Sequence, residues 1–347
     1  MRNLLLLLCV FSFAFLSAQS ETKTKEKKGR AYFTFKTGYT FPVAKTTVGS
    51  PKPELGKLLI RSNDDPNNYQ YSEKQPFGTR GAGFQVAGSV GYMFIDNFGL
   101  EMEFSFLRSS KILDARRDET NAAGLNYFAE QHSYTNMVRM APMVVVSGNP
   151  NKKFTPYGKF GILLPFAGKT IVEATINDKT GVMADNTLPL LNKELADSIA
   201  SHGLNIPIPT ETYIKAKTAG QFSIGFAARV GCTYNITPKW SVFAEAEMNM
   251  LTIKAKDTKF VDFSTETPED LIAAAEIILG MENIQSKYGM EDLPEILRVT
   301  EYKNEITETS NSSYNYARKD EPLEQVTFRD SYNSFGFMLG FKYNFGK

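Results

Sequence analysis

The sequence has few of the residues that build most chemical sites: two cysteines, two histidines and one tryptophan in 347 residues. Cys9 lies in an N-terminal apolar run, so a processed chain keeps only Cys232 and forms no internal disulfide. The 39 Lys and Arg balance the 38 Asp and Glu, which argues against a nucleic-acid partner. No dinucleotide, phosphate-loop or zinc-ligand pattern appears, so we predict no cofactor and no metal site.

Long hydrophobic runs are also missing. The longest, Leu4 to Leu16, is too short for a membrane-spanning helix. Arg2 before it and the small residues of "LSAQS" after it are typical of a secretory signal peptide. We therefore predict a signal peptide over residues 1–20, cleaved after Ala18 or Ser20, and a periplasmic segment over 21–29.

Aromatic residues are abundant, with 26 Phe and 16 Tyr, and they concentrate in segments that alternate apolar and polar side chains. Such alternation with a period of two is typical of β-strands. It predicts eight strands: 30–41, 83–94, 98–107, 133–146, 154–166, 220–235, 240–251 and 334–345.

Short and long connections between these strands alternate strictly. Three are tight turns, "IDN", "SGNPNKK" and "ITPK", and four are long, with about 40, 25, 50 and 80 residues. This segregation is typical of an outer-membrane barrel with periplasmic turns and extracellular loops. A lipocalin-like or jelly-roll domain has the same number of strands, but its architecture gives no reason for short and long connections to alternate. We predict a transmembrane eight-stranded antiparallel up-and-down β-barrel over 30–347, with partly helical extracellular loops at 43–80, 111–129, 167–217 and 254–332.

Aromatic side chains recur at the predicted periplasmic strand ends, as in the girdle where amphipathic rings lie between lipid and water. The girdle is predicted to contain Tyr32, Phe33, Phe94, Phe98, Phe154, Tyr234, Trp240, Tyr343 and Phe345.

Two segments carry a family resemblance: "GYMFIDNFGLEMEFSF" and, at the C-terminus, "FGFMLGFKYNFGK". They resemble the eight-stranded outer-membrane β-barrel proteins of Bacteroidetes-type bacteria, known as the porin family or the OmpA-like β-barrel domain. The resemblance implies a place in the cell outer membrane, surrounded by lipid. It also implies insertion by the barrel-assembly machinery, whose signal is similar to Gly340, Phe341, Tyr343 and Phe345 here, although this chain ends on Gly346-Lys347.

In a barrel the apolar face of each strand meets lipid and the polar face meets the interior. The segment "FGLEMEFSF" (98–106) would then point Glu101 and Glu103 inward. The same alternation predicts a lumenal charge network at mid-height, with four acids and five bases: Lys36, Glu101, Glu103, Arg139, Lys159, Arg229, Glu245, Glu247 and Lys342.

The two glutamate pairs stand on opposite walls. Arg139 is expected beside Glu101 and Glu103, and Arg229 and Lys342 beside the other pair. An eight-stranded barrel has an interior just wide enough for its side chains, so the network is predicted to form a closed structural core. A charged pore or gate is the alternative. Acid–base catalysis by the paired carboxylates is not predicted, because it would need room for a substrate inside the barrel.

Two amphipathic helices are predicted in the long loops. One covers 187–203, with Thr187 as N-cap, and the other covers 267–280, with Thr267 as cap and Gly280 as stop. A further turn is expected after Pro294. The helices would cap the barrel mouth, or their apolar stripes would bind a ligand or partner.

Function is expected in these loops, because long loops on a rigid scaffold usually carry binding residues. We predict a structural or surface role in binding a ligand or an envelope protein. The alternatives are a porin-like channel for small solutes and an accessory barrel of an envelope secretion apparatus. His132 beside Ser133 invites comparison with a hydrolase, but no oriented acid completes a catalytic set, so no enzyme is predicted.

Overall fold

The structure is a computed structural model. It describes residues 30–43, 58–62, 70–74, 78–120, 124–181, 197–198, 201, 210–280, 282–312 and 318–345. The predicted signal peptide, the segment 21–29 and nearly all of the helix predicted at 187–203 lie outside the described residues.

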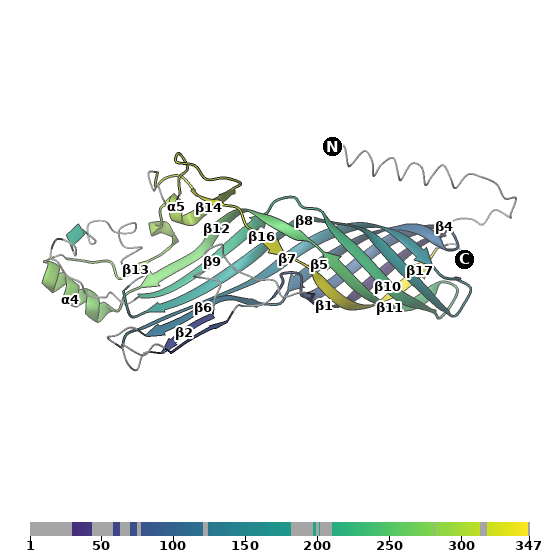
Figure 1. The fold of residues 1–347 in the computed structure, drawn as a ribbon, viewed down its shortest axis with the longest axis horizontal. Helices are drawn as coiled ribbons and strands as arrows, with labels where there is room; N and C mark the ends of the chain where they lie inside the picture. Colours follow the sequence, from purple (N-terminus) through teal and green to yellow (C-terminus); the bar gives the residue numbers. More distant parts are fainter. Residues whose placement is uncertain are drawn as a thin grey trace.

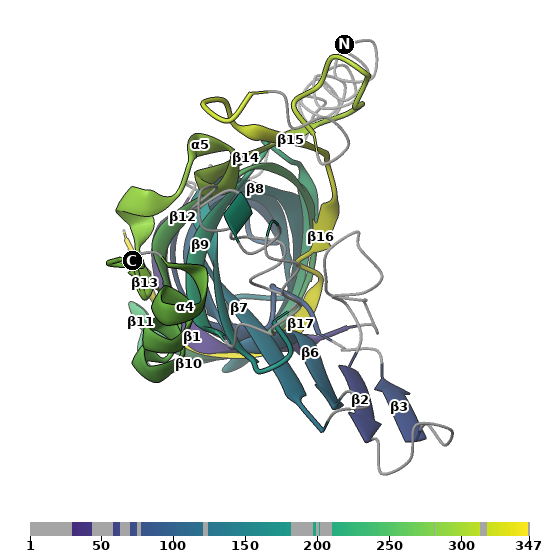
Figure 2. The same ribbon diagram turned by 90° about the vertical axis from the view of Figure 1, so that its left-hand side faces the viewer.

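Eight antiparallel strands close into a barrel, seen at the right of Figure 1 and end-on in Figure 2. Each strand pairs with the next, and the last pairs with the first from Tyr32 opposite Asn344 to Pro42 opposite Ser334. The predicted eight-stranded barrel is confirmed. Its strands are β1 (Arg30–Pro42), β4 (Gly83–Ile95), β5 (Phe98–Ser109), β7 (Asn126–Ser147), β8 (Phe154–Asp178), β10 (Gly225–Asn235), β11 (Trp240–Met250) and β17 (Ser334–Asn344).

The barrel wall continues on one side into a sheet beyond the membrane-sized part. β7 and β8 have 22 and 25 residues, whereas about 9 to 11 residues cross a bilayer. Their extra lengths pair with each other, with β6 (Ile112–Thr120) and with β9 (Thr210–Gly220), and β9 pairs with β12 (Thr252–Glu266). We call β6, β9, β12 and the outer parts of β7 and β8 the extension sheet (Figure 1).

Much of the chain expected in the loops 111–129, 167–217 and 254–332 is therefore strand, and the prediction that these were loops was wrong to that extent. The predicted strand 220–235 is likewise broken at residues 221–224. Both errors have one cause. Outside lipid a strand needs no face of large apolar side chains, so "TIVEATIND" (170–178) shows β-branched residues but not the aromatic alternation that marks the membrane strands.

Short elements decorate the extension sheet. The strands are β2 (Leu58–Ser62), β3 (Gln70–Lys74), β13 (Lys287–Tyr288), β14 (Val299–Lys303), β15 (Leu323–Val326) and β16 (Arg329–Ser331). The helices are α4 (Glu269–Leu279), η1 (Met290–Asp292) and α5 (Glu295–Arg298). No helix in the described part of the chain is both long and apolar enough to cross a membrane.

Helix α4 confirms the helix predicted at 267–280, and α5 confirms the turn after Pro294. Gly280 ends α4 in the left-handed conformation, with φ 64°, which glycine adopts without steric cost. The predicted cap was wrong: Pro268 is the N-cap residue and no side chain caps the helix. Thr267 instead donates its backbone N–H to Ser286 O at 2.8 Å, which ties it to the segment that follows the helix.

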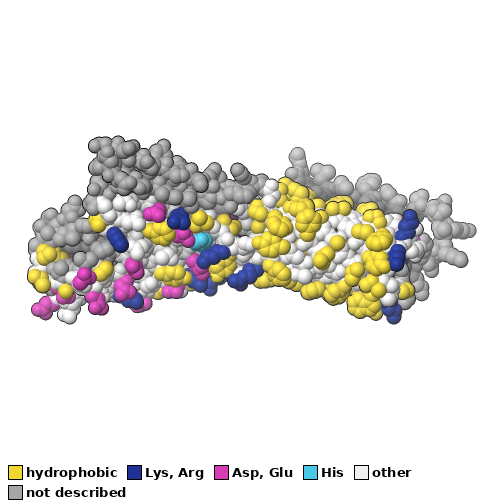
Figure 3. All heavy atoms as spheres, turned by 90° about the horizontal axis from the view of Figure 1, so that it is seen from below, with side chains coloured by type: hydrophobic (Ala, Val, Ile, Leu, Met, Phe, Trp, Pro, Cys, Tyr) yellow, Lys and Arg dark blue, Asp and Glu magenta, His cyan; other side chains and the backbone are white. Residues whose placement is uncertain are grey.

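A belt of apolar side chains surrounds the barrel, and charged side chains begin beyond it on the extension sheet (Figure 3). Most of the predicted girdle faces outward at the short-turn end, including Phe98, Phe154, Trp240 and Phe345. Tyr32 was wrongly placed in it, because it is only 2% exposed and points inward. It shares the face of Lys36, which lies four residues further along β1.

Trp240 gives a direct measure of depth, because it is the only tryptophan and is exposed at the short-turn end. We expect lipids brominated near the headgroup to quench its fluorescence more than lipids brominated near the chain end, since indole rings favour the interface. The control is Val230→Trp in a Trp240→Phe background. Val230 lies opposite Ala246 at mid-height and is exposed, so the order of quenching should reverse. The same order at both positions would contradict this placement.

Candidate functional site in the barrel interior

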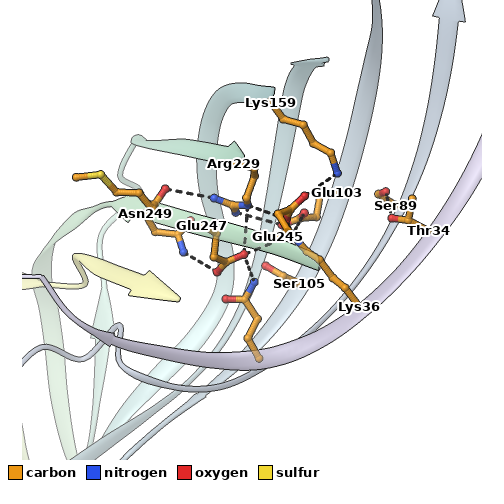
Figure 4. Close-up of polar contacts among 12 residues, drawn as sticks. Thr34, Lys36, Ser89, Glu103, Ser105, Lys159, Arg229, Glu245, Glu247 and Asn249 are labelled. Atoms are coloured by element: carbon orange, nitrogen blue, oxygen red, sulfur yellow. Dashed lines mark hydrogen bonds and ion pairs between the residues drawn. The ribbon is translucent and has the colours of Figure 1, made fainter. Parts of the chain in front are cut away.

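The inward face of the barrel carries the predicted charges. Eight of the nine residues are at most 6% exposed: Lys36, Glu101, Glu103, Arg139, Lys159, Arg229, Glu245 and Glu247. Their side chains converge from β1, β5, β7, β8, β10 and β11, and Figure 4 shows most of them. The ninth, Lys342, is only half-buried and its Nζ lies 3.9 Å from the centre of the Tyr32 ring.

Lys36 is the centre of this cluster. Its Nζ lies 2.7 Å from Glu103 Oε2, 2.5 Å from Glu245 Oε1 and 3.4 Å from Glu247 Oε2. Glu103 belongs to β5 and the other two glutamates to β11, which are on opposite walls of the closed ring. A single ammonium group therefore ties the two walls together across the lumen.

Two further cations complete the pairing. Arg229 lies 3.3 Å from Glu103 and 3.2 Å from Glu247. Lys159 lies 2.9 Å from Glu101 and 3.1 Å from Glu245. Each of the four carboxylates thus contacts at least one cation, which is the condition for keeping a charge out of water.

Arg139 does not pair with Glu101 or Glu103 as predicted. The register places it opposite Ser105, two residue pairs beyond Glu103, which faces Ala141. Its Nε donates to Ser105 Oγ at 3.3 Å and its Nη2 donates to Gln85 Oε1. Gln85 in turn donates to Glu247 at 3.3 Å, so the guanidinium meets the glutamates through a neutral amide.

Neutral side chains that sequence reasoning missed complete the network. The hydroxyls of Tyr32 and Tyr157 donate to Glu101 and Glu245, at 2.7 and 3.0 Å, and Asn249 donates to Glu247 at 3.0 Å. These three side chains and Gln85 occupy inward positions of the apolar–polar alternation. That alternation is the sequence signal by which they could have been found. We call these four residues and the eight buried charges the lumenal network.

The lumenal network closes a small vestibule at the short-turn end. This cavity of about 60 Å³ is lined by Tyr32, Tyr157, Glu101, Lys159 and other inward residues. A cluster of buried apolar side chains packs against the network. Its members Ala141, Met143 and Ala227 lie at the height of the network, opposite Glu103, Glu101 and Asn249. The others form an apolar layer above it: Met137, Leu163, Leu251, Ile253 and Tyr332. Ions entering from the short turns thus meet first a paired charge layer and then a hydrocarbon layer.

Arg80 anchors the chain above the apolar layer. Its Nε lies 2.9 Å from Asp330, its Nη2 lies 3.8 Å from Asp114, and its Nη1 donates to Ser133. Burial raises the pKa of Asp330, with Arg80 opposing and Asp114 adding to the rise. Two carboxylates share this one guanidinium, so the cluster ties β6 and β16 to the segment before β4.

His132 and Ser133 face opposite sides of β7. Ser133 is buried against Arg80, whereas the half-exposed His132 places Nδ1 3.3 Å from Glu130. The pair therefore forms no nucleophile and base.

The predicted assembly signal lies on β17 and on Phe345 directly after it, with Phe341 and Phe345 exposed. Gly340 faces inward beside Lys36. A Cβ at Gly340 would lie 2.3 Å from Phe35 O and 2.9 Å from Lys36 Cβ, so only glycine leaves room for the lysine stem. The assembly role of these residues stays a prediction.

Removing the central ammonium should be costly. We expect Lys36→Ala to lower the free energy of unfolding by about 3 to 5 kcal/mol, because buried carboxylates lose their shared partner. The measurement is the urea unfolding midpoint in lipid vesicles. Lys239→Ala, in the exposed turn between β10 and β11, is the matched control and should change stability by less than about 0.5 kcal/mol. Equal midpoints for the two variants would contradict the central role of Lys36.

Comparison with known proteins agrees with this architecture. Residues 6–267 match the family described as the outer membrane protein beta-barrel domain. No curated protein sequence matches the chain. Among solved structures, Neisserial surface protein A is 9% identical with a TM-score of 0.30, over 91% of this chain and 99% of that one. OprG from Pseudomonas aeruginosa is 12% identical with a TM-score of 0.35, over 92% and 98%.

Likenesses at these TM-scores carry no information on function. The family match covers well over half of the sequence, and the closed eight-stranded barrel with its apolar belt is the architecture that the family name describes. The chain therefore belongs to the family of outer membrane protein β-barrel domains, and its place is the outer membrane.

Proposed function

We propose that this protein is a sealed outer-membrane barrel that holds a binding surface outside the cell. There the extension sheet, with its short strands and helices, binds a ligand or an envelope protein. The observation that carries the proposal is the lumenal network. Charged groups from opposite walls lie within 2.5 to 3.4 Å of Lys36, and an apolar layer follows directly above. We infer that these two layers, both in the described part of the chain, block the passage of hydrated ions.

The extension sheet supports the binding part of the proposal. Strand lengths far beyond the bilayer requirement give a rigid scaffold for exposed connections, where binding residues usually lie. Between Lys254 and Tyr332 the sequence has 17 acidic and 9 basic residues, so this surface repels polyanions and favours neutral or cationic partners. We include no catalytic role, and we take export by the signal peptide and insertion by the assembly machinery as parts of the proposal.

A porin-like channel is the alternative, suggested by the sequence resemblance to the Bacteroidetes-type porin family. The two functions differ in conductance. We expect the purified protein to give no steady channels in planar bilayers, because both the ion-paired layer and the apolar layer would have to open. A sixteen-stranded porin is the positive control. Reproducible ohmic channels from the wild-type chain would overturn the sealed barrel and favour solute transport.

The proposal also fixes which end faces outward. In a Cys232→Ser background, Ile277→Cys on α4 should react in intact cells with a membrane-impermeant maleimide, because Ile277 is 83% exposed. Lys239→Cys in the short turn should react only after the cells are opened. Labelling of both in intact cells, or of Lys239→Cys alone, would contradict an extracellular extension sheet.

A further inference from the structure

The barrel wall is interrupted beside β8. This strand pairs with β10 as far as Leu163 opposite Gly225, and with β9 from Thr170 opposite Thr218. Within the described residues, positions 164–169 have no ladder partner on that side. The facing chain, residues 221–224, has left the strand conformation.

Local sequence explains the interruption. Phe166 is an extra residue in β8, because Arg139 pairs with Pro165 and Val138 with Ala167. Pro165 has no N–H to donate, and such residues are found at bulges and edges. Gly168 has a φ of +159° and packs against Met137, where a Cβ would meet Asn136 O at 2.8 Å. On the facing side, Gln221 turns to β12 and donates its N–H to Lys254 O at 2.8 Å.

A cavity of about 330 Å³ lies at this interruption. Its inner end is lined by Met137 and Ile253, which are 3% and 7% exposed and belong to the apolar layer. Its outer end is lined by Phe166 and Phe222, which are 59% and 74% exposed. The cavity therefore runs through the wall, from the lipid-facing surface to the interior above the lumenal network, and its volume is in the range of small-ligand pockets.

The chemistry of the lining is amphipathic. Most of the wall is hydrocarbon, and the polar groups at the inner end already bond one another: Thr170 Oγ1 lies 2.8 Å from Thr135 Oγ1 and 3.1 Å from the Tyr332 hydroxyl. Lys169 is the one charged side chain among the described lining residues, and it is exposed at the mouth. The exposed Ile224 and Phe226 continue the apolar belt beside Phe222, so the mouth lies where the lipid region ends.

We propose that this cavity binds the acyl chain of an anionic amphiphile, which enters sideways from the membrane. Hydrocarbon fills the space between Phe166, Phe222 and the apolar layer, and Lys169 holds the carboxylate or phosphate headgroup at the mouth. The acyl chain ends at the apolar layer, because Arg139 and the lumenal network close the lumen immediately below Met137. The site is thus a dead-end pocket and does not depend on what the extension sheet binds.

The test uses the purified full chain in nanodiscs with a palmitate probe that carries a photoreactive diazirine near the chain end. We expect adducts on Met137 or Ile253, identified by mass spectrometry, because bulk lipid cannot reach these buried side chains. Adducts on the lipid-facing Phe160 serve as the internal reference. An excess of unlabelled palmitate should suppress the inner adducts and leave those on Phe160 unchanged.

Two pairs of variants locate the site. Ala167→Trp covers the mouth and should reduce the inner adducts about tenfold, whereas Ala228→Trp, an outward alanine on β10, should not. Lys169→Gln should weaken competition by palmitate but not by its methyl ester. Lys217→Gln, an exposed lysine on β9 outside the lining, should behave as wild type.

Competition by lipid A in place of palmitate shows whether the ligand is a membrane lipid or a free fatty acid. Suppression of the Met137 and Ile253 adducts by either compound supports the site. The proposal is overturned if Met137 and Ile253 remain unlabelled in the wild-type chain. It is also overturned if Ala167→Trp labels as strongly as Ala228→Trp, or if neither palmitate nor lipid A competes.

Discussion

The pairing of buried charge across a narrow lumen is the constraint on which the rest of the structure depends. Eight strands enclose only enough space for side chains, so the glutamates of β5 and β11 must meet cations or remain unpaired in a dry interior. Lys36 meets both walls at once, and Arg229 and Lys159 complete the contacts. The small inward residues of neighbouring strands, such as Gly340 and Ala87, give these long side chains their room.

This constraint separates the interior from the binding surfaces. In the described interior the carboxylates are already paired, and methionine, leucine and isoleucine side chains cover them. The surfaces that we propose for ligands are therefore the extension sheet beyond the membrane and the wall interruption at Phe166. The pocket arises where β8 is freed from its membrane partner β10, and the same separation lets β8 pair with β9 in the extension sheet.

Sequence alternation predicted the barrel strands well, because lipid outside and a polar lumen inside impose opposite demands on successive residues. It placed Glu101, Glu103, Glu245, Glu247, Lys36, Lys159 and Arg229 in one interior. It failed where that contrast is weak. Tyr32 points into the interior although aromatic rings are common at the girdle. The strands of the extension sheet have no lipid-facing row of large apolar side chains, so their pattern resembles that of a loop.

The sequence by itself therefore determined the number of barrel strands, the inward direction of the lumenal charges, and the charge balance of the lumen, because these follow from periodicity and composition. Tertiary structure decided which charges meet. Register places Arg139 beside Ser105 and Gln85 and not beside Glu103. Strand order sets β1 midway between β5 and β11, so that Lys36 contacts glutamates of both. It also decided the bulge at Phe166 and the cavity behind it, since both depend on how neighbouring strands align, which the alternation within a single strand does not encode.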